Sequence, residues 1–286
     1  MPTFIQHNIR LDDGFCTRPG VRATMNQDPW FLAAKRILDV TFPGSKKGLR
    51  IADLGCLEGG YAVEFARLGF DVLGLDVRQV NIDACGFVKQ RTSLPNLQFV
   101  RDNAWNIAKY AKFDAIFCKG LFYHVDRPAE FLNLLAKSTA RILLLQTHFA
   151  EARDFPRIVP RPVHRLIPRV VPLQETGATK YGLSRLAHNE GVPGRWFREF
   201  RTARSFRDRE NSRRAAWDNK RSFWIQREYL LGAIQDARFD LIMEQFDGLG
   251  PRIGTSMTGG YYRMLGRGLF IGIKTPQSPA GKSHTG

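Results

Sequence analysis

The chain has 286 residues, of which 43% are apolar and 24% are charged, so it can bury a full core as a globular protein of one or two domains. No stretch approaches the ~18–20 apolar residues of a membrane span, and the first residues lack the basic leader and apolar segment of a secretory signal, so we expect a cytoplasmic protein. The net charge of +16 allows nucleic acid, acidic membranes or acidic small molecules as partners without choosing among them.

The predicted elements follow an irregular stretch over residues 1–27. Asp28 and Pro29 form a helix start, because aspartate caps free N–H groups and proline fits the first turn. From there, apolar strands alternate with helices of amphipathic spacing. We expect, in chain order, a helix over 28–40, a strand over 50–54, a helix over 60–68, a strand over 71–76, a helix over 79–89, strands over 97–101 and 113–118, a helix over 128–137 and a strand over 140–146.

The alternation stops after the fifth strand. Residues 150–224 are rich in proline and arginine, and strand patterning returns only after a helix over 225–237, with strands over 239–246 and 269–274. This order predicts an α/β fold: a Rossmann-like, doubly wound, mostly parallel seven-stranded sheet with helices on both faces and a long insertion after strand five. We interpret the insertion as a substrate-side lid, because ligands of open α/β sheets bind at the carboxyl ends of the strands.

A glycine loop follows the first strand of this sheet. Asp53, Gly55 and Gly59 give the pattern Asp-x-Gly-x-x-x-Gly, and Asp76 ends the second strand 23 residues after Asp53. A strand, a glycine loop, a helix and a second strand ending on an acid form the first unit of a nucleotide-type site. Leu57 stands where a dinucleotide loop needs its middle glycine, so the pattern does not favour a pyrophosphate ligand.

The run from Arg50 to about Gln146 resembles the core of the class I methyltransferases that depend on S-adenosylmethionine (SAM). Gly120 to His124 also resembles a Gly-x-x-Tyr-His element of members that include modifiers of tRNA wobble uridines. Leu57 departs from the family, many members of which have a third glycine there. The resemblance implies SAM as the methyl donor, with contacts to it from Asp53, Gly55, Gly59, Asp76 and Asp102.

Each part of SAM has a candidate partner among these residues. The glycines let the backbone approach the methionine part of the ligand, Asp76 can accept hydrogen bonds from the ribose hydroxyls, and Asp102 can accept one from the adenine amino group. The loop that begins with Lys119 follows strand four and should line the methionine end. The expected cofactor-binding residues are Asp53, Gly55, Cys56, Gly59, Asp76, Asp102, Asn103, Lys119 and Gly120.

Methyl transfer to a hydroxyl also needs a base to remove the proton. His124 after strand four and His148 after strand five are the candidates, and each also has a structural interpretation: packing the cofactor loop or bonding a carbonyl. Neither has metal-ligand spacing with another His or Asp, so we expect no metal site. The four cysteines lack Cys-x-x-Cys spacing, which favours free thiols over disulfides or zinc; they are Cys16, Cys56, Cys85 and Cys118.

Residues 151–230 hold 18 Lys and Arg against 9 Asp and Glu. Arginines recur every four residues from Arg153 to Arg169, but the prolines between them forbid a helix. Arginines also recur every three residues from Arg195 to Arg207, and on an α-helix this series would wind around the axis without forming one basic face. Arginines mixed with aromatic residues suit RNA, an anionic small molecule or glycan, or a solvated surface without a specific role. Three aromatic residues near the end of the insertion could wall an acceptor pocket or simply pack the lid: Trp217, Phe223 and Trp224.

These interpretations divide the chain into an N-terminal arm and helix (1–48), a SAM-binding core (49–149), a lid (150–224), the last helix and strands of the core (225–275) and a flexible tail (276–286). The function expected first is a SAM-dependent methyltransferase acting on an oxygen of a small-molecule or glycan acceptor, which can be anionic. Two alternatives stay open: a tRNA or rRNA methyltransferase that uses the basic insertion, and a SAM-binding regulatory protein without catalysis. The sequence does not fix the acceptor, the methylated atom or the oligomeric state.

Overall fold

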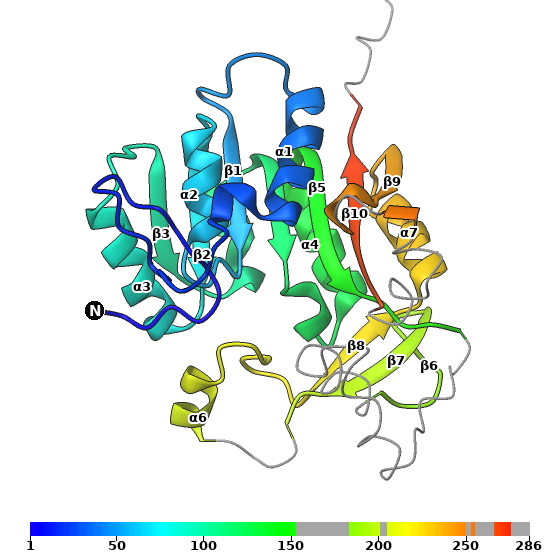
Figure 1. Cartoon of the computed structure of the whole chain (residues 1–286). Coiled ribbons are helices and arrows are strands. Elements are labelled where there is room, and N and C mark those ends of the chain that lie inside the picture. The colour runs from blue at the N-terminus through cyan, green and yellow to red at the C-terminus, as the bar shows by residue number, and fades with distance from the viewer. Residues whose placement is uncertain (153–182, 201–204, 250–252, 255–265, 276–286) are drawn as a thin grey trace, which may run out of the picture.

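The computed structural model describes residues 1–152, 183–200, 205–249, 253–254 and 266–275, and its centre is a seven-stranded sheet in the order β3-β2-β1-β4-β5-β10-β9 (Figure 1). Neighbours from β1 to β5 are parallel, and β10 is antiparallel to both β5 and β9. The predicted doubly wound, mostly parallel sheet is therefore confirmed. Its strands are β1 (Arg50–Leu54), β2 (Asp71–Asp76), β3 (Leu97–Arg101), β4 (Phe113–Lys119), β5 (Thr139–His148), β9 (Leu241–Gln245) and β10 (Arg267–Ile273).

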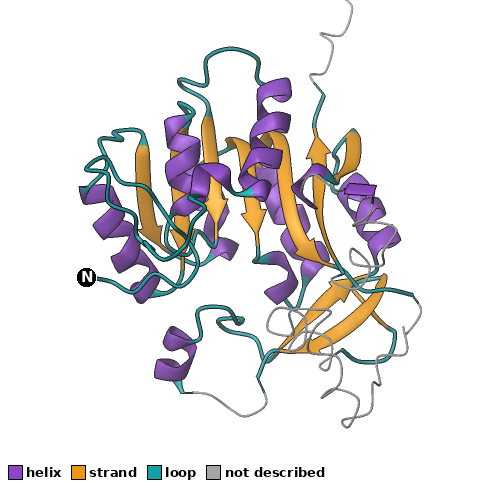
Figure 2. Ribbon diagram, viewed as in Figure 1, coloured by secondary structure: helices purple, strands orange, loops and turns teal. Residues whose placement is uncertain are grey.

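Helices cover both faces of this sheet (Figure 2). Along β5, Ile142 and Leu144 face one hydrophobic cluster while Leu143 and Leu145 face the other, because side chains alternate between the faces of a strand. The first cluster is completed by α1 (Pro29–Thr41), α2 (Gly60–Arg67) and α3 (Gln79–Gln90), and the second by α4 (Pro128–Ser138) and α7 (Arg227–Asp236). None of the helices in the described ranges is both long and apolar enough to cross a membrane.

The start of α1 and the segment before it follow the expected pattern only in part. Asp28 accepts hydrogen bonds from the N–H groups of Trp30 and Phe31, both at 3.0 Å, and so caps the helix as predicted. The preceding residues form no helix or strand apart from a short 3-10 turn over Met25–Gln27. They are nevertheless packed onto the domain, since Ile9 is 0% exposed.

The described part of the insertion contains a second, three-stranded antiparallel sheet, formed by β6 (Ala187–Asn189), β7 (Val192–Arg198) and β8 (Arg221–Ile225), and a short helix α6 (Phe206–Asn211). The prediction that strands return only after the helix near residue 225 is therefore wrong. Pairing with β8 and the contact of Trp196 with Phe223, whose ring centres are 5.0 Å apart, form β7 despite its proline and glycine. The predicted boundary between residues 224 and 225 falls inside β8.

The two arginine repeats do not form continuous features of the described structure. Arg195 and Arg198 lie on β7 and Arg207 lies in α6, so the repeat every three residues is split between a strand and a helix. Arg201 and Arg204, the whole repeat from 153 to 169, and the predicted tail over 276–286 lie outside the described residues.

Candidate functional site

The loop after β1 is held by contacts with the neighbouring strands. Gly55, Leu57 and Gly59 have positive φ angles of 68°, 53° and 78°. Leu57 therefore adopts the left-handed conformation that glycine adopts more easily, at a cost of about 1–2 kcal/mol, and its N–H donates to the Asp76 carboxylate at 3.0 Å. A Cβ at Gly59 would lie 2.5 Å from Cζ of Phe99, so this glycine is required by packing as well as by any ligand.

Asp76 at the end of β2 ties the loop to α3. One carboxylate oxygen accepts from Leu57, and the other accepts from the N–H of Arg78 at 2.9 Å and from the side chain of Asn81 at 3.0 Å. Burial raises the pKa of the carboxyl despite these bonds. Among the described residues, the oxygen facing the loop has one donor, the N–H of Leu57, which leaves it capacity to accept a further hydrogen bond.

Asp53 is a buried carboxylate, 2% exposed, that accepts from the N–H of Ala62 at 3.1 Å. Burial raises its pKa to about 7, although the charge of Lys119 opposes the shift. Burial and the charge of Arg267 lower the pKa of Lys119 to about 8, and the ammonium lies 4.8 Å from the centre of the Tyr61 ring. Within the described ranges no Lys, Arg or His side chain lies within ion-pair distance of Asp53, so its carboxylate has no direct counterion among them.

Asp102 and Asn103 follow β3, as expected, and both have protein partners. The Asp102 carboxylate accepts from the side chains of Asn106 at 2.6 Å and Tyr110 at 2.7 Å. Burial acts to raise its pKa, but these hydrogen bonds outweigh burial and the pKa is lowered. The Asn103 side chain donates to Asp218 of the insertion at 3.2 Å, which brings the insertion to the expected adenine end of the site.

Cys56 and Gly120 are part of the scaffold of the site. The N–H of Cys56 donates to the carbonyl of Leu75, and its thiol lies 3.9 Å from the thiol of Cys85. Burial raises the pKa of both thiols, which makes them unreactive. Gly120 has a φ of 77°, and its N–H donates to the carbonyl of Gln146 at 3.1 Å, which joins the loop after β4 to β5.

His124, in the turn after β4, forms a buried pair with Glu199. Its Nδ1 lies 2.8 Å from Oε1 of Glu199, and the two side chains are 12% and 1% exposed. Glu199 also accepts from the hydroxyl of Ser222 at 2.7 Å and from the N–H of Ala216 at 3.0 Å. The carboxylate therefore places the proton of His124 on Nδ1 and leaves Nε2 as the basic nitrogen. In the described part of the chain, Nε2 has no hydrogen-bond partner.

His148, at the end of β5, lies in a stack of aromatic rings. Its ring is parallel to that of Trp224, with centres 4.6 Å apart and planes at 7°, and edge-on to Tyr123 at 4.5 Å. Its Nδ1 is 3.2 Å from the carbonyl of Gly266. Tyr123 also contacts the ring of His124, at 4.3 Å. The two candidate histidines are thus brought together, on either side of Tyr123.

The three aromatic residues near the end of the insertion take different places. Trp224 stacks on His148, while Phe223 is 0% exposed and belongs to the core, so it does not wall a pocket. Trp217 lies beneath the guanidinium of Arg78, 5.4 Å from its carbon to the ring centre.

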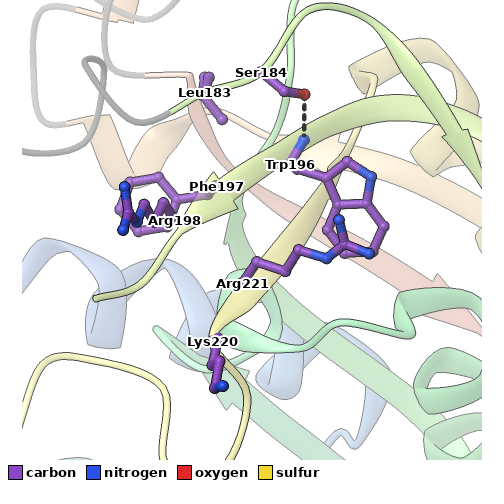
Figure 3. Close-up of a pocket in the computed structure, with 7 residues that line it drawn as sticks. All are labelled: Leu183, Ser184, Trp196, Phe197, Arg198, Lys220 and Arg221. Carbon is purple, nitrogen blue, oxygen red and sulfur yellow. Dashed lines mark hydrogen bonds between the residues drawn. The ribbon is translucent and has the colours of Figure 1, made fainter. Parts of the chain in front are cut away.

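A pocket of about 480 Å³ lies on the small sheet of the insertion (Figure 3). The Arg221 guanidinium lies over the Trp196 ring at 3.9 Å, and Phe197 stacks at 5.1 Å on Trp224, which joins the pocket to the rings around His148. Most of its lining residues are aromatic or cationic, and the full set is Leu183, Ser184, Trp196, Phe197, Arg198, Lys220 and Arg221.

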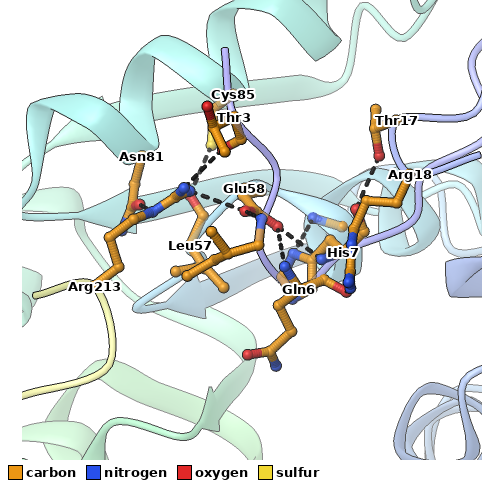
Figure 4. A network of polar contacts seen from close by, with 12 residues as sticks. Thr3, Gln6, His7, Thr17, Arg18, Leu57, Glu58, Asn81, Cys85 and Arg213 are labelled. Atoms are coloured by element: carbon orange, nitrogen blue, oxygen red, sulfur yellow. Dashed lines mark hydrogen bonds and ion pairs between the residues drawn. The ribbon is translucent and has the colours of Figure 1, made fainter. Parts of the chain in front are cut away.

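A network of polar contacts joins the insertion to the glycine loop (Figure 4). Arg213 donates to Glu58 at 2.9 Å and to the side chain of Asn81 at 2.6 Å. Glu58 is 0% exposed and also accepts from backbone N–H groups of the N-terminal segment, including that of His7 at 2.7 Å. Through these hydrogen bonds, the carboxylate of Glu58 holds both the N-terminal segment and the insertion against the glycine loop.

Three residues of the site are not predictable from the sequence, because no local spacing links them to their partners: Glu199, Arg213 and Arg267. Glu199 is 75 residues from His124 in the chain, and only the tertiary structure brings them together. Among the residues that the structure describes, no three His, Cys, Asp or Glu side chains are grouped as ligands for a metal ion.

Comparisons with known proteins agree with this geometry. Residues 45–159 match the family model described as a methyltransferase domain. The ubiquinone biosynthesis O-methyltransferase of Roseobacter denitrificans is 33% identical over 95 residues, which are 33% of this chain and 38% of that protein. The tRNA U34 carboxymethyltransferase of Campylobacter lari is 27% identical over 130 residues, 43% of this chain and 44% of that protein. The chain thus spans less than half the length of these curated relatives.

The fold is shared with a solved structure over almost the whole chain. The N-terminal domain of EvdMO1, crystallised in the presence of SAH and D-fucose, has a TM-score of 0.60 and 20% identity, with coverage of 94% of this chain and 90% of that one. SAH is S-adenosylhomocysteine, the product that SAM becomes on losing its methyl group.

Proposed function

We propose that this chain is a SAM-dependent methyltransferase that methylates a hydroxyl oxygen of a small-molecule or glycan acceptor, which is supported by the match of residues 45–159 to the methyltransferase family model. The observation that carries this proposal is the partly buried hydrogen bond of 2.8 Å between His124 and Glu199 at the carboxyl edge of the sheet. Methylation of a hydroxyl needs a base, and a histidine oriented by a carboxylate is suited to that task. The O-methyltransferase name of the relative from Roseobacter denitrificans supports the same reaction class.

The loop residues would hold SAM through complementary charge and hydrogen bonds. When bound, SAM supplies a methyl group on a positively charged sulfur, already activated for in-line displacement. Asp53 would stabilise the positive charge of the ligand, Asp76 would accept from its ribose hydroxyls, and Asp102 would accept from its adenine amino group. Gly55 and Gly59 would leave room beside the backbone, and Lys119 would line the methionine end.

His124 would act as the base, whereas the ring of His148 would line the acceptor site. Nε2 of His124 would take the proton of the acceptor hydroxyl, and Glu199 would stabilise the resulting positive charge on the imidazole while retaining the hydrogen bond to Nδ1. The stacked ring of His148 would instead position the acceptor together with Tyr123 and Trp224.

Substitution of the two histidines tests this assignment. With tritiated SAM and a cell fraction that accepts methyl groups, H124Q should lower the rate by roughly 10²–10⁴-fold and leave the affinity for SAH unchanged. H148Q is the matched comparison and should lower the rate less than H124Q. A rate for H124Q close to that of the wild type would eliminate His124 as the base.

RNA is a second candidate acceptor, supported by the likeness to the tRNA U34 carboxymethyltransferase and by the cationic and aromatic lining of the pocket in Figure 3. Tritiated SAM offered to separate RNA, glycan and small-molecule fractions distinguishes the candidates. Label in RNA, with binding that weakens steeply as salt increases, would replace the small-molecule proposal. SAH binding without turnover in any fraction would favour a regulatory protein that has lost catalysis.

A further inference from the structure

The sheet edge beside the candidate base carries a group of polar side chains on one face. Gln146 lies near the end of β5, and Arg267 opens β10, which is antiparallel to β5. Lys119, at the end of β4, pairs in register with Gln146. Because side chains alternate along a strand, all three project from the face packed against α1 to α3, which is also the face of Asp53.

Two buried donors in this group lack acceptors. Nη2 of Arg267 donates to Oε1 of Gln146 at 3.1 Å, which turns the amide nitrogen of Gln146 away from the guanidinium. Within the described ranges, neither Nε2 of Gln146 nor Nε of Arg267 has a hydrogen-bond partner, although both atoms are buried. An unsatisfied buried donor costs roughly 1–3 kcal/mol, and such groups are almost always paired. An acceptor atom supplied by a ligand would satisfy both donors.

The guanidinium of Arg267 also lacks a negative partner among its described contacts. The described contacts of the Arg267 guanidinium are Gln146 and the ring of Tyr123, whose centre is 5.6 Å away, and neither is negative. Lys119 adds a second cation, whose pKa is lowered by burial and by the charge of Arg267, while the charges of Asp28 and Asp53 oppose the shift. Negative groups therefore lie near Lys119, and the charge without a described counterion is that of Arg267. Tyr123 contacts His124 at 4.3 Å, so the uncompensated charge lies one ring away from the candidate base.

We propose that Arg267 and Gln146 form a subsite for a carboxylate of the acceptor, which deepens the proposed function and rests on it. One carboxylate oxygen accepts from Nε of Arg267 and the other from Nε2 of Gln146, so both donors are satisfied and the guanidinium gains a counterion. Because Tyr123 separates this subsite from His124, the hydroxyl that is methylated lies several bonds from the carboxylate. A sugar acid has this arrangement.

D-Galacturonate and D-fucose test the subsite, because they differ only at C6, where the first has a carboxylate and the second a methyl group. We would measure their binding to the SAH-loaded protein by calorimetry. The wild type should bind D-galacturonate at least tenfold more tightly than D-fucose. R267M should remove this preference while its affinity for SAH stays within threefold of the wild-type value. R22M, which removes an exposed arginine, is the control and should keep the preference.

The outcomes separate the subsite from the proposed function. Failure of the wild type to bind SAH would refute both. SAH binding with no preference for D-galacturonate would refute the subsite and leave the methyltransferase proposal standing. A tenfold loss of SAH affinity in R267M would show that the guanidinium serves the cofactor, and would also refute the subsite. If R267M does not fold, the comparison of the two sugars on the wild type decides alone.

Discussion

Replacement of Asp53 by asparagine should stabilise the protein and weaken its binding of SAM. Asp53 is 2% exposed, and burial raises its pKa from 3.8 to about 7, so the folded protein holds the ionised carboxylate at a cost. Asparagine has the same shape and keeps an oxygen that can accept from Ala62. The variant removes the cost of the charge together with the charge that would attract a cationic ligand.

The size of this effect follows from the two pKa values. A carboxyl whose pKa is raised on folding contributes stability that is present below the pKa of the unfolded chain and is lost as the pH rises through that of the folded protein. At about 1.4 kcal/mol for each pKa unit, D53N should raise the free energy of unfolding by about 2 kcal/mol at pH 5 and by about 4 kcal/mol at pH 8.

Urea unfolding of the wild type and D53N at both pH values measures this gain, and the exposed Asp71 supplies the control variant D71N, which should change stability little at either pH. A gain that is absent, or equal at pH 5 and pH 8, would refute the reasoning from buried charge. Titration with SAM completes the assay: unchanged affinity in D53N would show that Asp53 makes no contribution to the ligand site.

Three further variants test the loop and its surroundings by urea unfolding. Gly59→Ala should lower the free energy of unfolding by about 2–4 kcal/mol, because its Cβ would lie 2.5 Å from Phe99 at a φ of 78°; unchanged stability would contradict the packing described for the loop. Arg213→Met should lower the free energy of unfolding by roughly 3 kcal/mol, since the buried Glu58 loses its ion pair. The additional change E58Q should restore part of this loss, and a double variant no more stable than Arg213→Met would contradict the role of the ion pair. Lys119→Met should raise the free energy of unfolding by about 3 kcal/mol at pH 6, because burial lowers the pKa of Lys119 from 10.5 to about 8. The gain should shrink as the pH rises above 8, and a gain independent of pH would rule out this cause.

The sequence was sufficient to predict the parallel half of the sheet, because most of its strands, such as β1, β2 and β4, are largely buried on both faces and read as short apolar runs. β1, β2 and β3 have the predicted bounds. The cap at Asp28 was also predictable, since it depends on two adjacent residues.

The parts that the sequence did not reveal depend on distant contacts. β7 contains Pro193, Gly194 and Arg195 and is formed by pairing with β8, so its local pattern does not indicate a strand. The sequence of the N-terminal segment predicts an irregular arm, because nothing in it shows that its backbone N–H groups donate to the carboxylate of Glu58. The link between His124 and Glu199 has the same origin, since the insertion must fold back over the sheet before the pair can form.

Calorimetric titration of the wild-type protein with SAH tests the central claim, that the loop from Asp53 to Gly59 and the acid Asp76 form the site of the methyl donor. We predict binding of one SAH for each chain and a large loss of affinity in D76A. No binding of SAH by a folded wild-type protein, or equal binding by D76A, would contradict this account.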